Sequence, residues 1–433
     1  MRGERAAHTV GAAIALLIAA FLFLACVSFA QREIHSLPDA PSEHSESVKS
    51  QLWLLGIGGF VSGTAIRIAE PMLPKLAEEF AVTGAGAASV ITAFALSYGL
   101  FQLVHGPIGD RFGKLRTIAI ALCLAGFATI ACATATSLES LAFYRFLAGM
   151  TAGAVIPLSF AFIGDNIPFE SRQAVLGQFI SGILIGGVLG PLLGGVFSDL
   201  LGWRYTFWLP GIAFIFIGAL LGYKARHERV AKDSERAGVL AVYATLLRMR
   251  SVRTICMFVA IESFLFQGGF AYLGVFMRET YAFSFTVIGL CIAGMGLGGL
   301  GYSSSVKWLM NRLGQARMVL IGGVILALMY ACIAAGPLGV LMAPLIIVGG
   351  YAFNMLHNTL QTFATEMAPG SRGAAVALFA FALFFGQALG VSGAGVTIET
   401  FGYAPTFIFA GVGLAILGWR FSAWITRSQV RAG

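Results

Sequence analysis

The chain alternates long apolar runs with short polar turns from Leu52 to about Ile425. A helix needs about 20 apolar residues to cross a hydrocarbon core of roughly 30 Å, and each run has about that length. Lipid offers no hydrogen bonds, so every backbone amide must be paired within its own segment, which predicts helices and not strands. The predicted spans are 53–74, 84–105, 117–136, 141–163, 174–197, 204–224, 254–275, 284–306, 318–336, 341–364, 374–397 and 404–425. The predicted fold class is therefore an all-α membrane protein with twelve transmembrane helices.

The composition excludes a soluble globular protein. Hydrophobic residues make up 58% of the chain and charged residues 11%, whereas charged residues form about 25% of a soluble domain. The six cysteines lie in apolar segments without metal-ligand spacing, so we expect packing roles, no disulfide and no metal site. The net charge of +8 is not gathered on one amphipathic face, and no nucleic-acid partner is expected.

Lys and Arg residues report the orientation instead, because they alternate from side to side with the spans. If the turn from Asp110 to Arg116 is cytoplasmic, that side collects eighteen basic residues in its turns, linker, tail and adjoining helix ends. The opposite side has three, Lys75, Arg204 and Arg278. The positive-inside rule then places both ends of the twelve-helix core in the cytoplasm. We expect a multi-pass protein of the cell (inner) membrane.

The first fifty residues fit this topology poorly. Arg2 and Arg5 precede an extra apolar segment, Val10 to Ala30, and a polar stretch follows. Cleavage of a signal peptide after Ala30 would leave the new terminus outside, and a thirteenth span would require the two arginines outside. The third interpretation is that translation begins near Val48. All three stay open at the level of the sequence.

An internal repeat with an offset of about 200 residues divides the core. Gly186, Gly190 and Gly195 match Gly386, Gly390 and Gly395, and a Leu-Gly-Trp motif at 201–203 matches Phe-Gly-Tyr at 401–403. Several matches in order at one offset indicate a duplication. Each half holds an even number of spans, so the copies share one orientation and are related by an axis along the membrane normal.

The predicted organisation follows from this repeat. The predicted units are an N-terminal extension 1–51, a six-helix bundle 52–224, a basic cytoplasmic linker 225–253, a second six-helix bundle 254–425 and a cytoplasmic tail 426–433. The substrate path is expected between the two bundles. The linker is interpreted as a solvated tether, with regulation or lipid binding as the alternative.

The turn between the second and third spans carries the most specific motif. Its glycines and charged residues are Gly106, Asp110, Arg111, Gly113, Lys114 and Arg116, and a weaker copy at 311–317 has Asn311 in place of Asp110. This pattern resembles the signature of the major facilitator superfamily of transporters. The resemblance implies a cytoplasmic gating latch, formed in the outward-open state and broken on the inward swing. The alternative is a charged loop that only fixes topology.

The fifth predicted span carries a second motif, made of Gly186, Gly190, Pro191, Gly194 and Gly195. Small residues four apart allow close helix packing in lipid, and proline bends the axis. Packing alone would explain the glycines. The pattern, however, resembles the helix 5 motif of the superfamily's proton-coupled exporters, which implies export, and Val391 replaces the proline in the second half.

The charged residues Arg67, Glu70 and Glu262 lie inside predicted spans. Arg67 and Glu70 share one helical face of the first span, and Glu262 lies near the middle of the seventh among phenylalanines. Intramembrane charges are costly unless paired or wetted, and burial penalises the charged form of a carboxyl. Glu70 and Glu262 are therefore the candidate proton-coupling groups. The alternative is a structural ion pair of Arg67 with Glu70 or with Glu262.

Arg145 begins the fourth span and resembles the superfamily's helix 4 arginine motif. The resemblance implies a positive charge that faces the cavity and tunes the protonation of a nearby carboxyl. The alternative is that Arg145 snorkels to the interface.

A polar stripe on the tenth span faces either the cavity or a partner helix. In the superfamily this helix lines the cavity, which implies substrate contact for the stripe. His357 can also titrate near physiological pH or act as a hydrogen-bonded filler. The candidate cavity residues are Asn354, His357, Asn358 and Gln361, with Gln267 on the seventh span as a weaker candidate.

We therefore expect a secondary transporter that resembles the twelve-helix drug:proton antiporters of the superfamily. No nucleotide-binding loop occurs in the sequence, so neither ATP-driven transport nor another enzyme activity is expected, and no cofactor. The expected function is proton-coupled efflux of small, partly hydrophobic compounds or drugs by alternating access, from a monomer in the bilayer. The alternative is a proton symporter that imports a sugar, organic acid or other nutrient.

Overall fold

The computed structural model describes residues 43–227, 239–336 and 338–432, and every regular element in them is helical. The extra N-terminal apolar segment, and with it the choice among its three interpretations, lies outside the described residues. The longer helices are α2 (Glu43–Arg67), α5 (Ser89–Phe112), α6 (Lys114–Ala133), α7 (Leu138–Ala152), α8 (Val155–Asn166), α9 (Phe169–Leu200), α10 (Tyr205–Lys224), α12 (Arg250–Ala271), α14 (Phe285–Ala334), α15 (Met342–Glu366), α16 (Arg372–Phe401) and α17 (Tyr403–Ala432). The shorter ones are α3 (Leu73–Phe80), α4 (Gly84–Ala87), α11 (Val239–Arg248), α13 (Leu273–Tyr281) and the 3-10 helices Glu70–Met72, Ala225–His227, Gly339–Leu341 and Pro369–Ser371.

Eleven segments of the described chain are long and apolar enough to cross a membrane. One of them, Phe285–Ala334, has 50 residues, or about 75 Å of helix, more than twice the hydrocarbon thickness. Its backbone leaves the helical conformation at Gly314, with φ 68° and ψ 167°. This segment therefore contains two of the predicted spans, and the all-α, twelve-helix prediction is confirmed.

The internal repeat is visible in the backbone. Non-glycine residues with positive φ occur at Ala81 and Ala282, about 200 residues apart. Gly113 and Gly314 form a second such pair, and Gly202 and Gly402 a third. An unusual conformation that recurs at one offset marks equivalent turns, because L-residues adopt positive φ rarely. At Gly113 and Gly314 the chain reverses between consecutive spans, as a glycine allows.

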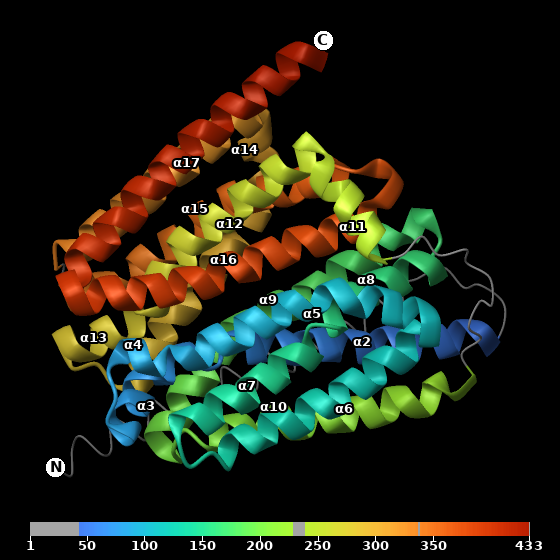
Figure 1. Cartoon of the computed structure of the whole chain (residues 1–433), viewed down its shortest axis with the longest axis horizontal. Helices are drawn as coiled ribbons and strands as arrows, with labels where there is room; N and C mark the ends of the chain where they lie inside the picture. The colour runs from blue at the N-terminus through green and yellow to red at the C-terminus, as the bar shows by residue number, and fades with distance from the viewer. Residues whose placement is uncertain (1–42, 228–238, 337, 433) are drawn as a thin grey trace.

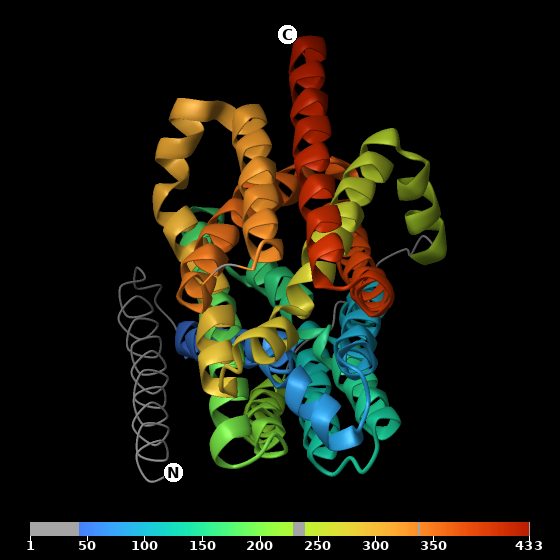
Figure 2. The ribbon, with the colours of Figure 1, turned by 90° about the vertical axis from the view of Figure 1, so that its left-hand side faces the viewer.

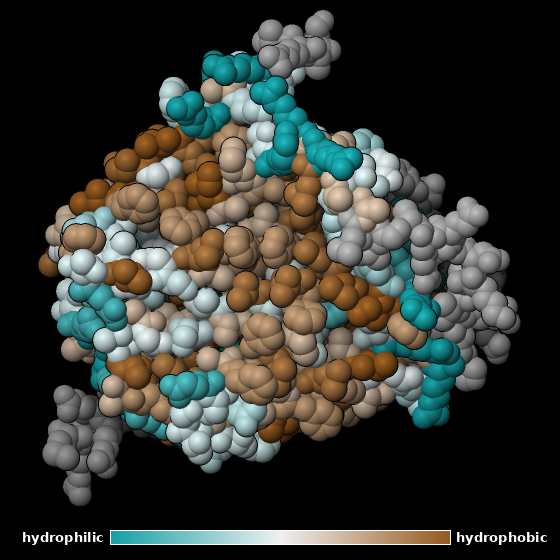
Figure 3. All heavy atoms as spheres, in the orientation of Figure 1, coloured by the Kyte–Doolittle hydropathy of each residue, from teal (hydrophilic) through white to brown (hydrophobic). Residues whose placement is uncertain are grey.

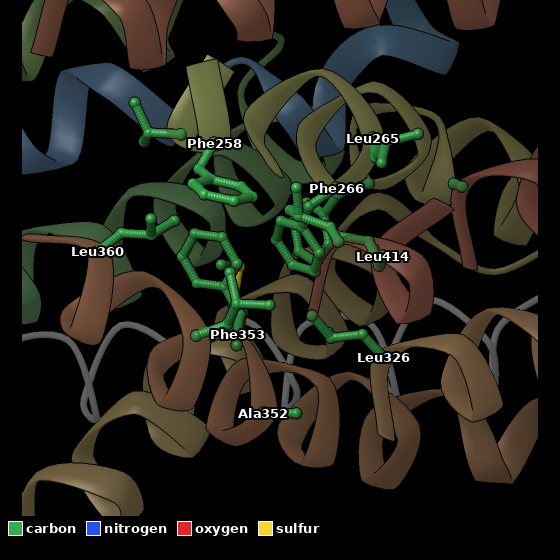
Figure 4. Packing of buried hydrophobic residues seen from close by; sticks show 14 of the residues in the cluster. Phe258, Leu265, Phe266, Leu326, Ala352, Phe353, Leu360 and Leu414 are labelled. Carbon is green, nitrogen blue, oxygen red and sulfur yellow. The ribbon is translucent and has the colours of Figure 1, made fainter. Parts of the chain in front are cut away.

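The helices form two groups (Figure 1; Figure 2). Helices α2 to α10 lie in one group, and α12 to α17 lie in the other. The largest buried apolar cluster uses residues between Leu246 and Ile425, and Figure 4 shows its aromatic centre around Phe258, Phe266 and Phe353. A second cluster uses residues between Leu52 and Ala225. Each group therefore has a core of its own.

Apolar side chains also cover the outside of the helices. In the middle of the face in Figure 3 the surface is hydrophobic, and hydrophilic residues gather toward its edges. Phe127, Phe216, Leu328 and Phe409 are each at least 60% exposed. So much exposed apolar surface fits contact with lipid and not with water.

The segment predicted as a linker contains a helix. α11 packs on α12 and α16, with Leu246 buried. The Tyr243 hydroxyl donates a hydrogen bond of 3.0 Å to the Leu103 carbonyl of α5, and burial raises the pKa of this phenol. The described part of the linker is therefore packed against both groups.

Candidate functional site

The seam between the two groups is formed by α9 against α14 and by α5 against α16. The helices have two ends, which we name after an acidic residue at each. The Asp199 end is the one at which α9 ends. The Asp110 end is the opposite one, where the chain turns from α5 into α6. Contacts between α9 and α14 extend from Asp199 and Thr286 to Val188 and Gly296, over about three turns of each helix. A buried apolar cluster with residues of both groups, including Ile68 and Tyr272, also lies at the Asp199 end. The seam is therefore closed at that end.

Arg67 and Glu70 form an ion pair at this seam. The Arg67 Nη1 to Glu70 Oε1 distance is 3.3 Å, and the Glu70 side chain is buried. α2 ends at Arg67, and Pro71 follows in a 3-10 helix, so the first predicted span is interrupted here. The Arg67 guanidinium lies 5.5 Å from the ring centroid of Phe270, on α12. The pair thus belongs to one group and touches the other.

Glu262 forms its hydrogen bond with His357 and not with Arg67. Glu262 is fully buried on α12, and its Oε2 lies 2.7 Å from Nδ1 of His357 on α15. The other carboxyl oxygen, Oε1, has no hydrogen-bond partner in the described structure. The imidazole stacks on Phe353, with ring centroids 5.0 Å apart. The result is a buried dyad, two groups that share one hydrogen bond and can hold a proton between them.

Arg145 is buried inside the first group and does not snorkel. Its side chain is 1% exposed. Nη1 donates to the Ala65 carbonyl at 3.2 Å, and the guanidinium lies 3.9 Å from the Phe94 ring centroid. These contacts hold the cation against a helix backbone and an aromatic face. The predicted tuning of a carboxyl by Arg145 stays a prediction.

The polar stripe of α15 is split between neighbours. Asn354 donates to the Gly350 carbonyl at 2.8 Å and lies beside Gly299 of α14, while Asn358 donates to Asn354 Oδ1 at 3.4 Å. His357 turns toward α12, as described above. Gln361 is exposed and Gln267 is partly buried. The stripe therefore contacts partner helices at Asn354 and His357, and its role in substrate contact stays a prediction.

The charged turn at the Asp110 end is built by contacts within the first group. Lys114 bonds Asp165 of α8 and lies 3.8 Å from Asp110. Arg116 donates to the carbonyls of Ala225 and Arg226 at 3.1 and 3.0 Å. Gly113 supplies the reversal, with φ 95°. Gly106 has open space around it, and Arg111 lies 5.3 Å from the ring centroid of Phe112.

The glycines of α9 let two helices approach its backbone. A Cβ at Gly186 would meet the Phe60 carbonyl, one at Gly190 the Thr64 carbonyl at 2.6 Å, and one at Gly194 the Ile68 carbonyl, all on the first span. Gly195 faces the other way, toward the Phe285 carbonyl of α14. The motif therefore packs α9 against its own group and against the opposite group at once.

Sequence reasoning missed Asp199 at the end of α9. Its carboxylate accepts hydrogen bonds from the start of α14, across the seam. A signal was present, because Asp199 follows Gly195 by four residues and so shares its helical face. The partner residues, about 85 positions away, could not be read from spacing.

Comparison with known proteins agrees with this architecture. The sequence model of the family described as "Major Facilitator Superfamily" matches residues 55–391. The "Uncharacterized MFS-type transporter YwfA" of Bacillus subtilis is 23% identical, over 86% of this chain and 90% of that protein. "Efflux pump radE" of Floropilus chiversii is 25% identical over 60% of this chain and 55% of its own. The "4-hydroxybenzoate transporter PcaK" of Acinetobacter baylyi is 28% identical over 39% of this chain and 38% of its own.

A solved structure is similar in fold along most of the chain. It is a bacterial homologue of the human lysosomal transporter Spinster, in an inward-facing and occupied conformation. The TM-score is 0.70 at 16% identity, over 90% of this chain and 98% of that one. The two structures therefore share the arrangement of their helices.

Proposed function

The chain belongs to the major facilitator superfamily of secondary transporters, and on that premise we propose that it exports small, partly hydrophobic compounds in exchange for protons. The two six-helix bundles, 52–224 and 254–425, rock around a shared central cavity. Protonation of a buried carboxyl competes with substrate binding, so that inward proton movement drives outward substrate movement. The protein works as a monomer in the inner membrane.

The observation that carries the proposal is the dyad of Glu262 and His357. A fully buried carboxyl with one unpartnered oxygen is costly to keep charged, since burial removes its hydration. Its one hydrogen-bond partner is itself a group that can gain and lose a proton. Such a site binds and releases protons with small movements of the two helices α12 and α15. We infer that Glu262 is the principal proton carrier and that His357 relays the proton.

Glu70 is the second candidate and differs in its environment. It is held by Arg67, which also lies over Phe270 of the opposite bundle. Substrate or proton binding at Glu70 would free Arg67 and change a contact across the seam. We therefore assign Glu70 and Arg67 to the coupling between protonation and bundle movement.

The proposed orientation follows from the distribution of basic residues. With the positive side in the cytoplasm, the Asp110 end is cytoplasmic and the closed Asp199 end faces outward. A closed outward end is a feature expected of an inward-facing state, and we infer that state for this structure. In the proposed cycle Asp110, with Arg111, Lys114 and Arg116, forms the cytoplasmic latch only after the bundles rock to the outward-facing state.

Export is favoured over import by the motif on α9. This motif resembles the helix 5 motif of proton-coupled exporters, and its glycines Gly186, Gly190 and Gly194 pack tightly against the first span while Gly195 packs against α14. A relative named as an efflux pump supports the same direction. Import by proton symport is the second candidate, since another relative is named as a 4-hydroxybenzoate transporter and the amides of α15 would suit a polar nutrient.

Flux in proteoliposomes tests the proposal. Purified protein is reconstituted, a pH gradient is imposed, and a panel of dyes, antibiotics, sugars and aromatic acids is followed across the membrane. The proposal expects at least one partly hydrophobic compound to move against the direction of the protons. Movement of a sugar or acid in the same direction as the protons would establish the symporter instead.

A further inference from the structure

We propose that Asp199 is a gating residue that locks the Asp199 end by capping the first turn of α14. This inference rests on the alternating access proposed above and adds a residue that no motif of the chain assigns. Asp199 lies in the last turn of α9, which belongs to the first bundle, and α14 belongs to the second bundle. Any separation of the bundles at this end must break the contact.

The carboxylate binds three donors of one helix terminus. Its Oδ1 accepts from the Phe285 amide at 3.2 Å, and its Oδ2 accepts from the Thr286 amide at 2.7 Å and from the Thr286 hydroxyl at 2.6 Å. The first amides of a helix have no partner within the helix. The Ser284 hydroxyl accepts a hydrogen bond from the Val287 amide. Asp199 accepts hydrogen bonds from the two preceding amides, those of Phe285 and Thr286.

The charge of Asp199 suits this position. A helix N-terminus carries a partial positive charge, and a carboxylate beside it makes short, charge-assisted hydrogen bonds. Thr286 is buried and Asp199 is partly buried, so water screens the contact less than it screens a surface pair.

Two glycines bring the helices close enough for this contact. A Cβ at Gly195 would meet the Phe285 carbonyl, and a Cβ at Gly289 would meet the Pro191 carbonyl. Gly195 lies one turn before Asp199 on the same face of α9. The close packing therefore sets the carboxylate opposite the amides of α14.

A second charged contact lies beside the first. Glu78 of the first bundle is 3.5 Å from Nε of Arg278, on α13 of the second. The same guanidinium donates to the Phe283 carbonyl at 3.1 Å and lies 4.9 Å from the Phe285 ring centroid. Acids of the first bundle thus face positive groups of the second around the start of α14.

The internal repeat supplies the comparison that singles out Asp199. Gly202 and Gly402 are equivalent, so the counterpart of Asp199 is Glu399. The counterpart of the start of α14 is Gly84, after the N-cap Thr83. Glu399 is exposed and has no hydrogen bond in the described structure, and a cavity of about 510 Å³ is lined by Thr83, Gly84 and Glu399. Only one of the two equivalent seams is capped.

Distances between spin labels test the lock without substrate and without a pH gradient. All six cysteines are replaced, and the protein is placed in lipid nanodiscs. Labels at the exposed Thr134 and Val340 report the Asp199 end, and labels at the exposed Gln173 and Asn311 report the other end. Asp199→Ala is compared with Glu399→Ala, the matched variant on the uncapped seam.

The lock predicts a rise of at least tenfold in the ratio of open to closed populations at the Asp199 end for Asp199→Ala. The labels at the other end should move closer together in the same variant. Thr286→Val, which keeps both amides and removes the hydroxyl, should show a smaller rise, and Glu399→Ala should show none. Asp199→Asn keeps the size of the side chain and removes its charge, and it takes the place of Asp199→Ala if the alanine variant does not fold.

Equal distance distributions for the Asp199 and Glu399 variants would overturn the lock. A failure of the proposed function has a different signature. If no compound exchanged with protons but Asp199→Ala still opened the Asp199 end, the gating role of Asp199 would be supported and the proposed proton-coupled transport would be refuted.

Discussion

Glu262→Gln tests the proton carrier with the least disturbance of the fold. Glutamine has the same shape and can keep the 2.7 Å contact with His357, but it cannot exchange a proton. A hydrogen bond to a charged group contributes about 1.5–3 kcal/mol and a neutral one about 0.5–1.5 kcal/mol. We therefore expect a loss of stability of about 1 kcal/mol and a protein that still inserts and folds.

The effect on transport should be far larger. One pH unit corresponds to about 1.4 kcal/mol per proton, which supports about a tenfold accumulation of a neutral substrate when one proton is exchanged. If Glu70 carried a second proton, the limit would be about a hundredfold. In Glu262→Gln the accumulation of substrate should fall by about tenfold per pH unit. If Glu262 is the sole proton carrier, the ratio of substrate concentrations across the membrane should fall to one.

The assay is the steady-state ratio of substrate inside and outside proteoliposomes, measured over a series of imposed pH gradients. Counterflow exchange at equal pH should persist in Glu262→Gln, which shows that the cavity still binds substrate. Glu70→Gln is measured in parallel, and Glu399→Gln serves as an exposed control. Full accumulation in both the Glu262 and the Glu70 variants would refute the assignment of these carboxyls as proton sites.

Other variants test separate parts of the account. His357→Ala leaves the buried Oε2 of Glu262 without its partner, so a loss of about 1–3 kcal/mol is expected; an unchanged thermal unfolding midpoint would count against the dyad. Asp110→Asn should slow turnover, a fall in kcat, and a pure rise in KM would contradict the latch. A Cβ at Gly190 would lie 2.6 Å from the Thr64 carbonyl, whereas one at Gly187 would meet nothing within 4 Å. Gly190→Ala should therefore destabilise by about 1–3 kcal/mol, and equal thermal stability of the two alanine variants would refute the packing argument.

The fold could be predicted because lipid leaves few choices. A run of about 20 apolar residues in a bilayer must be a helix, and that rule located all twelve crossings. The break between Arg67 and Glu70 was not predicted, because hydropathy averages over a window and passes smoothly across a single turn of 3-10 helix. The helix of the linker, Val239–Arg248, was also missed, since the charged stretch around it dominated the composition there.

The sequence predicted which residues belong to the candidate site, but not which of them form pairs. Glu262 and His357 were both named, because polar groups inside an apolar span stand out, but they lie on different helices 95 residues apart. Which face of α12 meets which face of α15 depends on packing that a hydrophobic pattern does not specify. Asp199 was passed over for a related reason: it lies at the end of a span, where acids are ordinary, and its partners belong to the other half.

The direction of proton movement during substrate movement tests the central claim most directly. Proteoliposomes containing a trapped pH-sensitive dye are prepared without a pH gradient, and a transported compound is then added outside. Exchange predicts that protons leave the vesicles as the compound enters, so the lumen becomes alkaline, and that the signal is lost in Glu262→Gln. Acidification of the lumen as the compound enters would show cotransport and would contradict the account.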